Sequence, residues 1–96
     1  MNTENIGFVG LGRMGLRMAF RLTEAYSVFG TDKVLSQKNS AEVSGITWID
    51  SSTSLASICR HIFIVAGSEN DVTEIIFGET GLIHGIDSDT TIIVCA

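Results

Sequence analysis

The stretch Ile6-Gly7-Phe8-Val9-Gly10-Leu11-Gly12-Arg13-Met14-Gly15 joins a short apolar run to a turn that contains closely spaced glycines. The run from Ile6 to Val9 is too short for a helix and too apolar for a loop, so it indicates a buried strand. Helical spacing after the turn places on one apolar face Gly15, Met18, Ala19, Leu22 and Ala25. The stretch therefore predicts a strand, a sharp turn and a helix in succession.

The glycines of this turn are expected to play different parts. Gly10 permits the tight turn, and Gly15 lets the new helix lie close to the strand. Gly12 allows the backbone to approach a phosphate, and a side chain forced to positive φ at this position is expected to cost about 1–2 kcal/mol. The N-terminus of the helix carries roughly half a positive charge, and its first amides can face an anion. Arg13 can add its own positive charge.

An acidic residue follows at the spacing expected of a dinucleotide site. Asp32 lies twenty residues after Gly12. It stands at the end of a second predicted strand, which runs from Tyr26 to Gly30 and ends at Thr31-Asp32. A carboxylate there can accept hydrogen bonds from a ribose. A glycine-rich turn alone is more often a plain loop, but the preceding strand, the following helix and Asp32 favour a cofactor site.

The rest of the chain continues the alternation of helices and strands. Residues 33–38 are compatible with one or two helical turns, and Asn39-Ser40 and Ser44-Gly45 resemble loop. The segment 81–85 reads as a small apolar surface segment. Further strands are predicted at 46–49, 62–65 and 91–95, and helices at 50–59 and 68–78, the latter burying Val72, Ile75 and Ile76.

Short links between alternating strands and helices predict right-handed parallel crossovers. The expected fold is therefore α/β, a Rossmann-type doubly wound parallel sheet with strand order 3-2-1-4-5. Ligands bind such sheets beyond the carboxyl ends of the strands, at the switch between strands 1 and 4. The turn at Gly10 and the loop Val65-Ala66-Gly67-Ser68 are expected to form the two sides of that crevice.

Composition narrows the choice of partners. The chain has 96 residues, enough for one domain, and a net charge of −5, which argues against a nucleic acid or an anionic membrane as partner. We expect a cytoplasmic protein, because no apolar run approaches the roughly 20 residues of a membrane span and the N-terminus lacks the features of a signal peptide. Arg13, Arg17 and Arg21 are expected on a solvated helix face.

The cysteines and histidines do not indicate a metal site. Cys59 and Cys95 lack a C-x-x-C spacing and a neighbouring histidine, so both are expected to behave as small buried hydrophobic residues. His61 and His84 are isolated in the sequence. No metal ligand is therefore predicted.

The sequence resembles the β-hydroxyacid dehydrogenase family, which includes 3-hydroxyisobutyrate dehydrogenase. The resemblance rests on the stretch from Ile6 to Gly15, on Met18-Ala19 and Arg21-Leu22, on Asp32, and on Ile76-Phe77-Gly78-Glu79-Thr80-Gly81-Leu82. It implies an NAD(P)-binding domain over residues 1–96, similar to that of 6-phosphogluconate dehydrogenase. It also implies an oxidoreductase that transfers a hydride between NAD(P) and a small 3-hydroxy acid.

The resemblance also implies roles for individual residues. The pyrophosphate would lie against Gly10, Leu11, Gly12, Arg13, Met14 and Gly15. Asp32 and Lys33 would meet the adenosine ribose, and Ala66 and Gly67 would line the loop near the cofactor.

In the family the catalytic lysine lies in a helical second domain, so no catalytic residue is expected within 1–96 and the chain is expected to be inactive alone. Because that domain would cover apolar surface, self-association of the chain is also expected. The family usually has proline at Arg17 and Leu-Pro at Ala66-Gly67, whereas this chain has no proline. These departures leave open a second function, a non-catalytic module with a structural or regulatory role.

The choice of cofactor can be argued from charge. A carboxylate at Asp32 accepts bonds from both ribose hydroxyls but repels a 2′-phosphate by up to about 4 kcal/mol per charge. Lys33 beside it attracts the same phosphate. NAD is therefore expected, NADP stays possible, and Asp32→Ala is predicted to relax the preference towards NADP.

Overall fold

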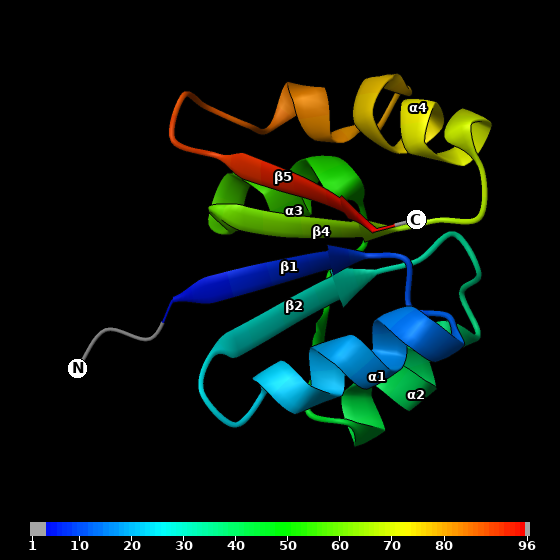
Figure 1. The fold of residues 1–96 in the computed structure, drawn as a ribbon, viewed down its shortest axis with the longest axis vertical. Coiled ribbons are helices and arrows are strands. Elements are labelled where there is room, and N and C mark those ends of the chain that lie inside the picture. Colours follow the sequence, from blue (N-terminus) through cyan, green and yellow to red (C-terminus); the bar gives the residue numbers. More distant parts are fainter. Residues whose placement is uncertain (1–3, 96) are drawn as a thin grey trace.

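A computed structural model describes residues 4–95, which form a five-stranded, all-parallel sheet in the order β3-β2-β1-β4-β5 (Figure 1). The predicted architecture and strand order are confirmed. In chain order the elements are β1 (Asn5–Val9), α1 (Arg13–Leu22), β2 (Ser27–Thr31), α2 (Gln37–Val43), β3 (Thr47–Trp48), α3 (Ser52–Ile58), β4 (His61–Val65), α4 (Glu69–Phe77), the 3-10 helix η1 (Leu82–His84) and β5 (Thr91–Cys95).

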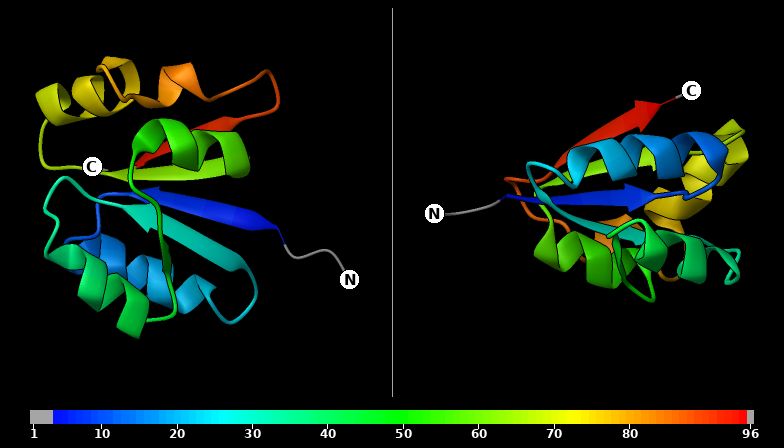
Figure 2. Two further views of the ribbon diagram at one scale, coloured as in Figure 1. Left: turned by 180° about the vertical axis from the view of Figure 1, so that it is seen from behind. Right: turned by 90° about the horizontal axis from the view of Figure 1, so that it is seen from below.

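The central strand β1 divides its side chains between two apolar clusters because successive residues of a strand point to opposite faces. Ile6 and Phe8 belong to a first cluster, which also takes buried residues from α1 and α2. Val9 belongs to a second cluster, built with α3, β4 and η1. Accordingly, α1 and α3 lie on opposite sides of the strands (Figure 2). Helices on both faces bury the sheet centre and leave the strand ends open for a site.

The first two helices differ from the sequence prediction at their ends. The predicted apolar face of α1 included Ala25, but α1 ends at Leu22 and Ala25 is exposed, since the amides of Ala25 and Tyr26 both bond the Leu22 carbonyl as the chain turns back. The loop predicted at Asn39-Ser40 is also wrong, because both residues lie within α2. Ala41 is fully buried in the first cluster, and this packing outweighs the weak preference of Asn39 and Ser40 for a loop.

Three further segments differ in extent or burial. β3 has two residues, not the four predicted. Val72, Ile75 and Ile76 of α4 are only half-buried, although they pack against the second cluster as expected. The segment 81–85 was expected at the surface, but Leu82 is fully buried beneath α3 and α4. An isolated leucine in a loop-like sequence gives no local signal of this burial.

The two cysteines occupy different environments. Cys59 is buried, as predicted, and burial raises the pKa of its thiol to about 12, so it stays protonated and packs as a hydrophobic group. Cys95 on β5 is only half-buried, so the prediction for it is only partly correct. Both thiols are free.

Candidate dinucleotide site

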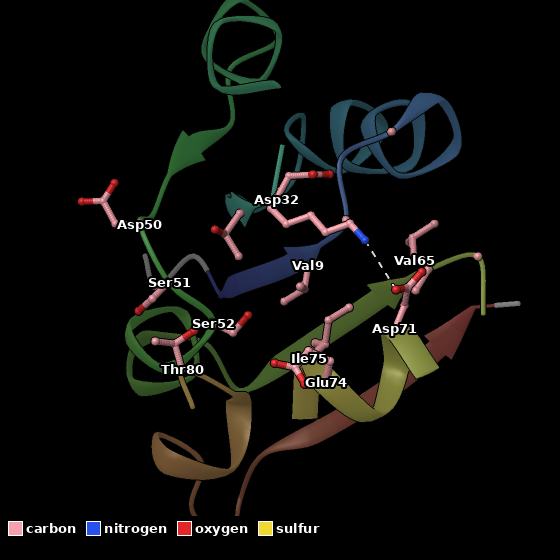
Figure 3. A pocket seen from close by; sticks show the side chains of 16 residues that line it. Val9, Asp32, Asp50, Ser51, Ser52, Val65, Asp71, Glu74, Ile75 and Thr80 are labelled. Carbon is pink, nitrogen blue, oxygen red and sulfur yellow. Dashed lines mark hydrogen bonds and ion pairs between the residues drawn. The ribbon is translucent and has the colours of Figure 1, made fainter. Parts of the chain in front are cut away.

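A pocket of about 450 Å³ opens at the carboxyl ends of β1 and β4, where the strand order switches direction (Figure 3). This volume lies within the range of small-molecule sites. The lining residues come from the last positions of β1, β2 and β4, from the loops after β1, β2, β3 and β4, from the start of α3, from α4 and from the loop after α4. They are Val9, Gly10, Gly12, Thr31, Asp32, Lys33, Asp50, Ser51, Ser52, Val65, Ala66, Gly67, Asp71, Glu74, Ile75 and Thr80. The predicted sides of the crevice, at Gly10 and at Val65–Gly67, are both present.

Two glycines of the turn are required by the fold itself. Gly10 has φ +104°, and a Cβ there would collide with the Val65 carbonyl oxygen. A Cβ on Gly15 would collide with the Gly10 carbonyl oxygen, so Gly15 lets α1 begin close against the turn, whereas the close approach was predicted against the strand. The Gly10 amide also donates to the Thr31 carbonyl at 2.9 Å, which ties the turn to β2.

Gly12 differs from both of these glycines. It is the N-cap of α1 with φ −71°, and no atom lies within 4 Å of the position that its Cβ would take. The expectation of a positive φ at Gly12 is therefore wrong, and that conformation belongs to Gly10. Gly67, on the opposite side of the pocket, also has open space around it. Nothing within the described chain requires a glycine at either of these two pocket positions.

The N-terminus of α1 has no side-chain cap, and its N-cap residue, Gly12, lines the pocket. The N-caps of α3 and α4, Ser51 and Ser68, each accept a bond from the amide three residues on, at 3.1 Å. Gly12 has no side chain that can do so, and α1 has no acidic residue in its first turn. The first amides of α1 therefore remain available for an anion, with the positive end of the helix dipole behind them.

Asp32 is held firmly at the end of β2. Its Oδ2 accepts from the Leu11 amide at 2.6 Å and its Oδ1 from the Val34 amide at 2.8 Å. Each oxygen keeps further acceptor capacity, because a carboxylate has about four acceptor positions. The Gln37 side-chain amide also donates to the Leu11 carbonyl at 2.9 Å. The glycine turn is thus fixed by the residues that follow β2, a role for Gln37 that the sequence did not reveal.

Charge in the pocket is mostly negative. Of the described residues, Asp32, Asp50, Asp71 and Glu74 contribute four carboxylates to the lining, against one ammonium, from Lys33. The Lys33 ammonium lies 3.4 Å from the Asp71 carboxylate, which joins the loop after β2 to the first turn of α4 (dashed line in Figure 3). These carboxylates repel a highly charged anion, so the pocket binds such an anion less favourably than the N-terminus of α1 alone would.

The structure brings together most of the residues predicted for the site. Those that line the pocket are Gly10, Gly12, Asp32, Lys33, Ala66 and Gly67. Leu11 is fully buried below the turn, and Gly15 is buried against it. Arg13 and Met14 are exposed in the first turn of α1 without lining the pocket, and Arg17 and Arg21 are also exposed, as predicted for a solvated face.

Sequence reasoning missed the part of the pocket formed by Asp50, Ser51, Ser52 and Thr80. The first three directly follow the predicted third strand, and the residues after every parallel strand gather at one edge of the sheet. That rule was sufficient to place them. Thr80 had no such signal, because its position depends on a contact between its carbonyl and the Thr53 amide, at 3.0 Å.

Among residues 4–95, no three His, Cys, Asp or Glu side chains are grouped so as to hold a metal ion. In that same part of the chain, none of the helices combines the length and apolar character required to cross a bilayer.

A parallel sheet in this order, with a glycine turn and an uncapped helix N-terminus at the switch point, defines the Rossmann class of α/β domains. The sequence matches, over residues 5–96, the family described as the NAD binding domain of 6-phosphogluconate dehydrogenase, and the chain belongs to that family.

Relatives with longer chains share this domain. The chain is 32% identical over 82 residues to the uncharacterised oxidoreductase YkwC of Bacillus subtilis. The matched region covers 84% of this chain and 28% of YkwC. It is 29% identical to a probable mitochondrial 3-hydroxyisobutyrate dehydrogenase-like protein of Arabidopsis thaliana, and the matched region covers 84% of this chain and 26% of that protein. The chain thus spans little more than a quarter of the length of these curated relatives.

Solved structures agree on the fold. The 3-hydroxyisobutyrate dehydrogenase of Mycobacterium tuberculosis superposes with a TM-score of 0.85 at 21% identity, over 97% of this chain and 31% of that one. The imine reductase of Myxococcus stipitatus, solved with NADP+, superposes with a TM-score of 0.83 at 10% identity, over 94% of this chain and 31% of that one. At these identities the likeness shows a common fold.

Proposed function

We propose that this chain is the dinucleotide-binding domain of a 3-hydroxyacid dehydrogenase, and that its pocket binds a nicotinamide dinucleotide. The family to which it belongs, the names of its relatives and the pocket at the strand switch support this proposal. The proposed reaction is hydride transfer between NAD(P) and a small 3-hydroxy acid. A proton-accepting group for that reaction is expected in a helical second domain, so residues 1–96 alone should bind cofactor without turnover.

The observation that carries the proposal is the free space at Gly12. Gly10 and Gly15 avoid collisions within the chain, whereas Gly12 has ordinary backbone angles and open pocket where a side chain would lie. A glycine at that place is explained if a ligand must reach the backbone. The unpaired amides of α1 beside it are suited to a pyrophosphate, which carries negative charge and accepts hydrogen bonds.

The remaining pocket residues can be assigned along a dinucleotide. Gly10 to Gly15 would surround the pyrophosphate, with Gly12 nearest to it and Leu11 and Gly15 supporting the turn from below. Asp32 would accept from the adenosine ribose, with Lys33 beside it. Ala66 and Gly67 would line the cofactor on the opposite side, where Gly67 leaves open space. Bound nicotinamide would supply the hydride acceptor, and this chain would hold and orient it.

The acidic lining favours NAD over NADP. An additional 2′-phosphate carries close to two negative charges and would enter a pocket with four carboxylates and one ammonium. Each unfavourable pair at about 4 Å costs up to roughly 4 kcal/mol at an effective dielectric of 20. We therefore propose NAD as the preferred cofactor, with NADP bound more weakly.

Gly12→Ala tests the proposal in the full chain, with Gly15→Ala as the matched control. The Gly12 variant is expected to change the free energy of unfolding by no more than about 1 kcal/mol, the scale of an N-cap difference. It should weaken NADH binding at least tenfold, as measured by calorimetry or nicotinamide fluorescence. The Gly15 variant should instead lose about 1–3 kcal/mol of stability, because its Cβ meets backbone.

The Gly12 variant separates ligand contact from folding, because it is expected to lose affinity for NADH while keeping nearly the stability of the wild-type chain. Equal NADH affinity in the wild-type chain and the Gly12 variant would contradict the assignment of the pyrophosphate to this turn. If the wild-type chain showed no saturable NADH signal, the non-catalytic module would be the better description. Measurable oxidation of a 3-hydroxy acid by residues 1–96 would refute the expected lack of turnover.

A further inference from the structure

The Lys33–Asp71 ion pair crosses the same pocket that the proposed function assigns to the dinucleotide. Lys33 follows directly on Asp32 at the end of β2, and Asp71 lies in the first turn of α4, on the far side of the switch. Both residues line the pocket, and their charged atoms are 3.4 Å apart. The only ammonium on the described lining is therefore drawn away from the β2 side towards α4.

This position matters for the choice between cofactors. The 2′-phosphate that distinguishes NADP belongs to the ribose that Asp32 is proposed to contact. Among the described residues that line the pocket, Lys33 is the one with a positive charge that could offset the repulsion between Asp32 and that phosphate. Its ammonium is instead paired with a carboxylate, so a phosphate would have to compete with Asp71 for it.

We propose that Asp71 is a specificity-determining residue, which favours NAD by holding Lys33 away from the 2′-phosphate of NADP. This inference rests on the proposed function. Asp71 acts here as a positioning residue, because its effect passes through Lys33 and does not require contact with the cofactor. The pair is exposed, with side-chain exposures of 81% for Lys33 and 42% for Asp71, so it can open and its influence should be modest.

The chain offers a control for the general effect of charge. Glu74 lies on the same helix and lines the same pocket, but among the described residues it forms no ion pair with Lys33. Glu74→Gln and Asp71→Asn each remove one negative charge from the pocket, whereas only the second releases Lys33. Asp71→Glu keeps a carboxylate within reach of Lys33 and serves as the conservative variant.

The test measures NADH and NADPH affinity by calorimetry in the full chain at one ionic strength, with thermal unfolding to confirm that each variant folds. Asp71→Asn is expected to raise NADPH affinity relative to NADH by about three- to fivefold, in line with the upper range of exposed ion pairs. Glu74→Gln should change that ratio less than twofold, and Asp71→Glu should leave it unchanged. In a Lys33→Met background, Asp71→Asn should have no more effect than Glu74→Gln.

The possible results are distinct. Equal shifts for Asp71→Asn and Glu74→Gln, or a shift for Asp71→Asn that persists without Lys33, would overturn the inference while leaving dinucleotide binding intact. The absence of saturable binding of either cofactor to the wild-type chain would overturn the proposed function, and this inference with it.

Discussion

At the scale of single residues, Asp32 has a structural task besides the one proposed for it. Its two carboxylate oxygens accept from the amides of Leu11 and Val34, and so hold the glycine turn against the end of β2. Removing the whole side chain would leave both amides without this acceptor, at a cost of about 1–3 kcal/mol for each one that stays buried. Asp32→Ala therefore mixes a loss of charge with a loss of support for the turn.

Asp32→Asn separates these two effects. The amide keeps one acceptor oxygen for the turn but loses the charge that repels a 2′-phosphate. We expect NADH affinity to fall about tenfold, since a hydrogen bond to a charged group is worth about 1.5–3 kcal/mol. NADPH affinity should fall less or rise, so that the ratio of NADH affinity to NADPH affinity becomes smaller. Parallel titrations with both cofactors check this, and an unchanged ratio would refute a role for Asp32 in discrimination.

At the scale of elements, the 3-10 helix η1 shows burial that a local pattern did not reveal. Leu82 is fully buried in the second cluster, while its neighbour Ile83 is 43% exposed. Leu82→Ala is expected to cost about 2–5 kcal/mol of unfolding free energy, because it removes packed volume from the core. Ile83→Ala is the matched control and should cost less than about 1 kcal/mol. Urea unfolding measures both losses of stability, and similar values would contradict the burial of Leu82.

The elements that the sequence predicted well are those with strong local signals. The apolar runs of β1, β4 and β5 were placed to within one residue, and Ser51 and Ser68 cap α3 and α4 through their side chains. The poorly predicted elements depend on distant contacts. α2 is held by the burial of Ala41 and by the bond from Gln37 to the Leu11 carbonyl, neither of which leaves a local pattern.

At the scale of the whole molecule, topology made much of the candidate site predictable. Parallel strands bring the residues after β1, β2 and β4 to one edge of the sheet, so Gly10, Asp32 and Gly67 were expected together and do line one pocket. The ion pair between Lys33 and Asp71 could not be foreseen, because the path of a long side chain depends on the exact separation of β2 and α4. The net negative lining also emerges only when the loops are assembled.

The sheet also leaves apolar surface at β5, which bears on the expected self-association. Within the described chain β5 pairs only with β4, so its other edge has unpaired backbone groups. Ile92 packs against the second cluster, whereas Ile93, on the opposite face by strand alternation, belongs to neither cluster, and Val94 is 51% exposed. An edge strand without charged side chains is a favourable surface for pairing with a second copy.

We therefore predict that the chain associates through β5 in a concentration-dependent manner. Val94→Lys should shift sedimentation velocity profiles towards monomer, since a lysine at an edge strand opposes pairing. Val43→Lys is the control: Val43 on α2 is also apolar and 80% exposed, but it lies away from β5. A stable monomer at high concentration would contradict the association itself, and equal effects of the two substitutions would show that β5 is not the surface involved.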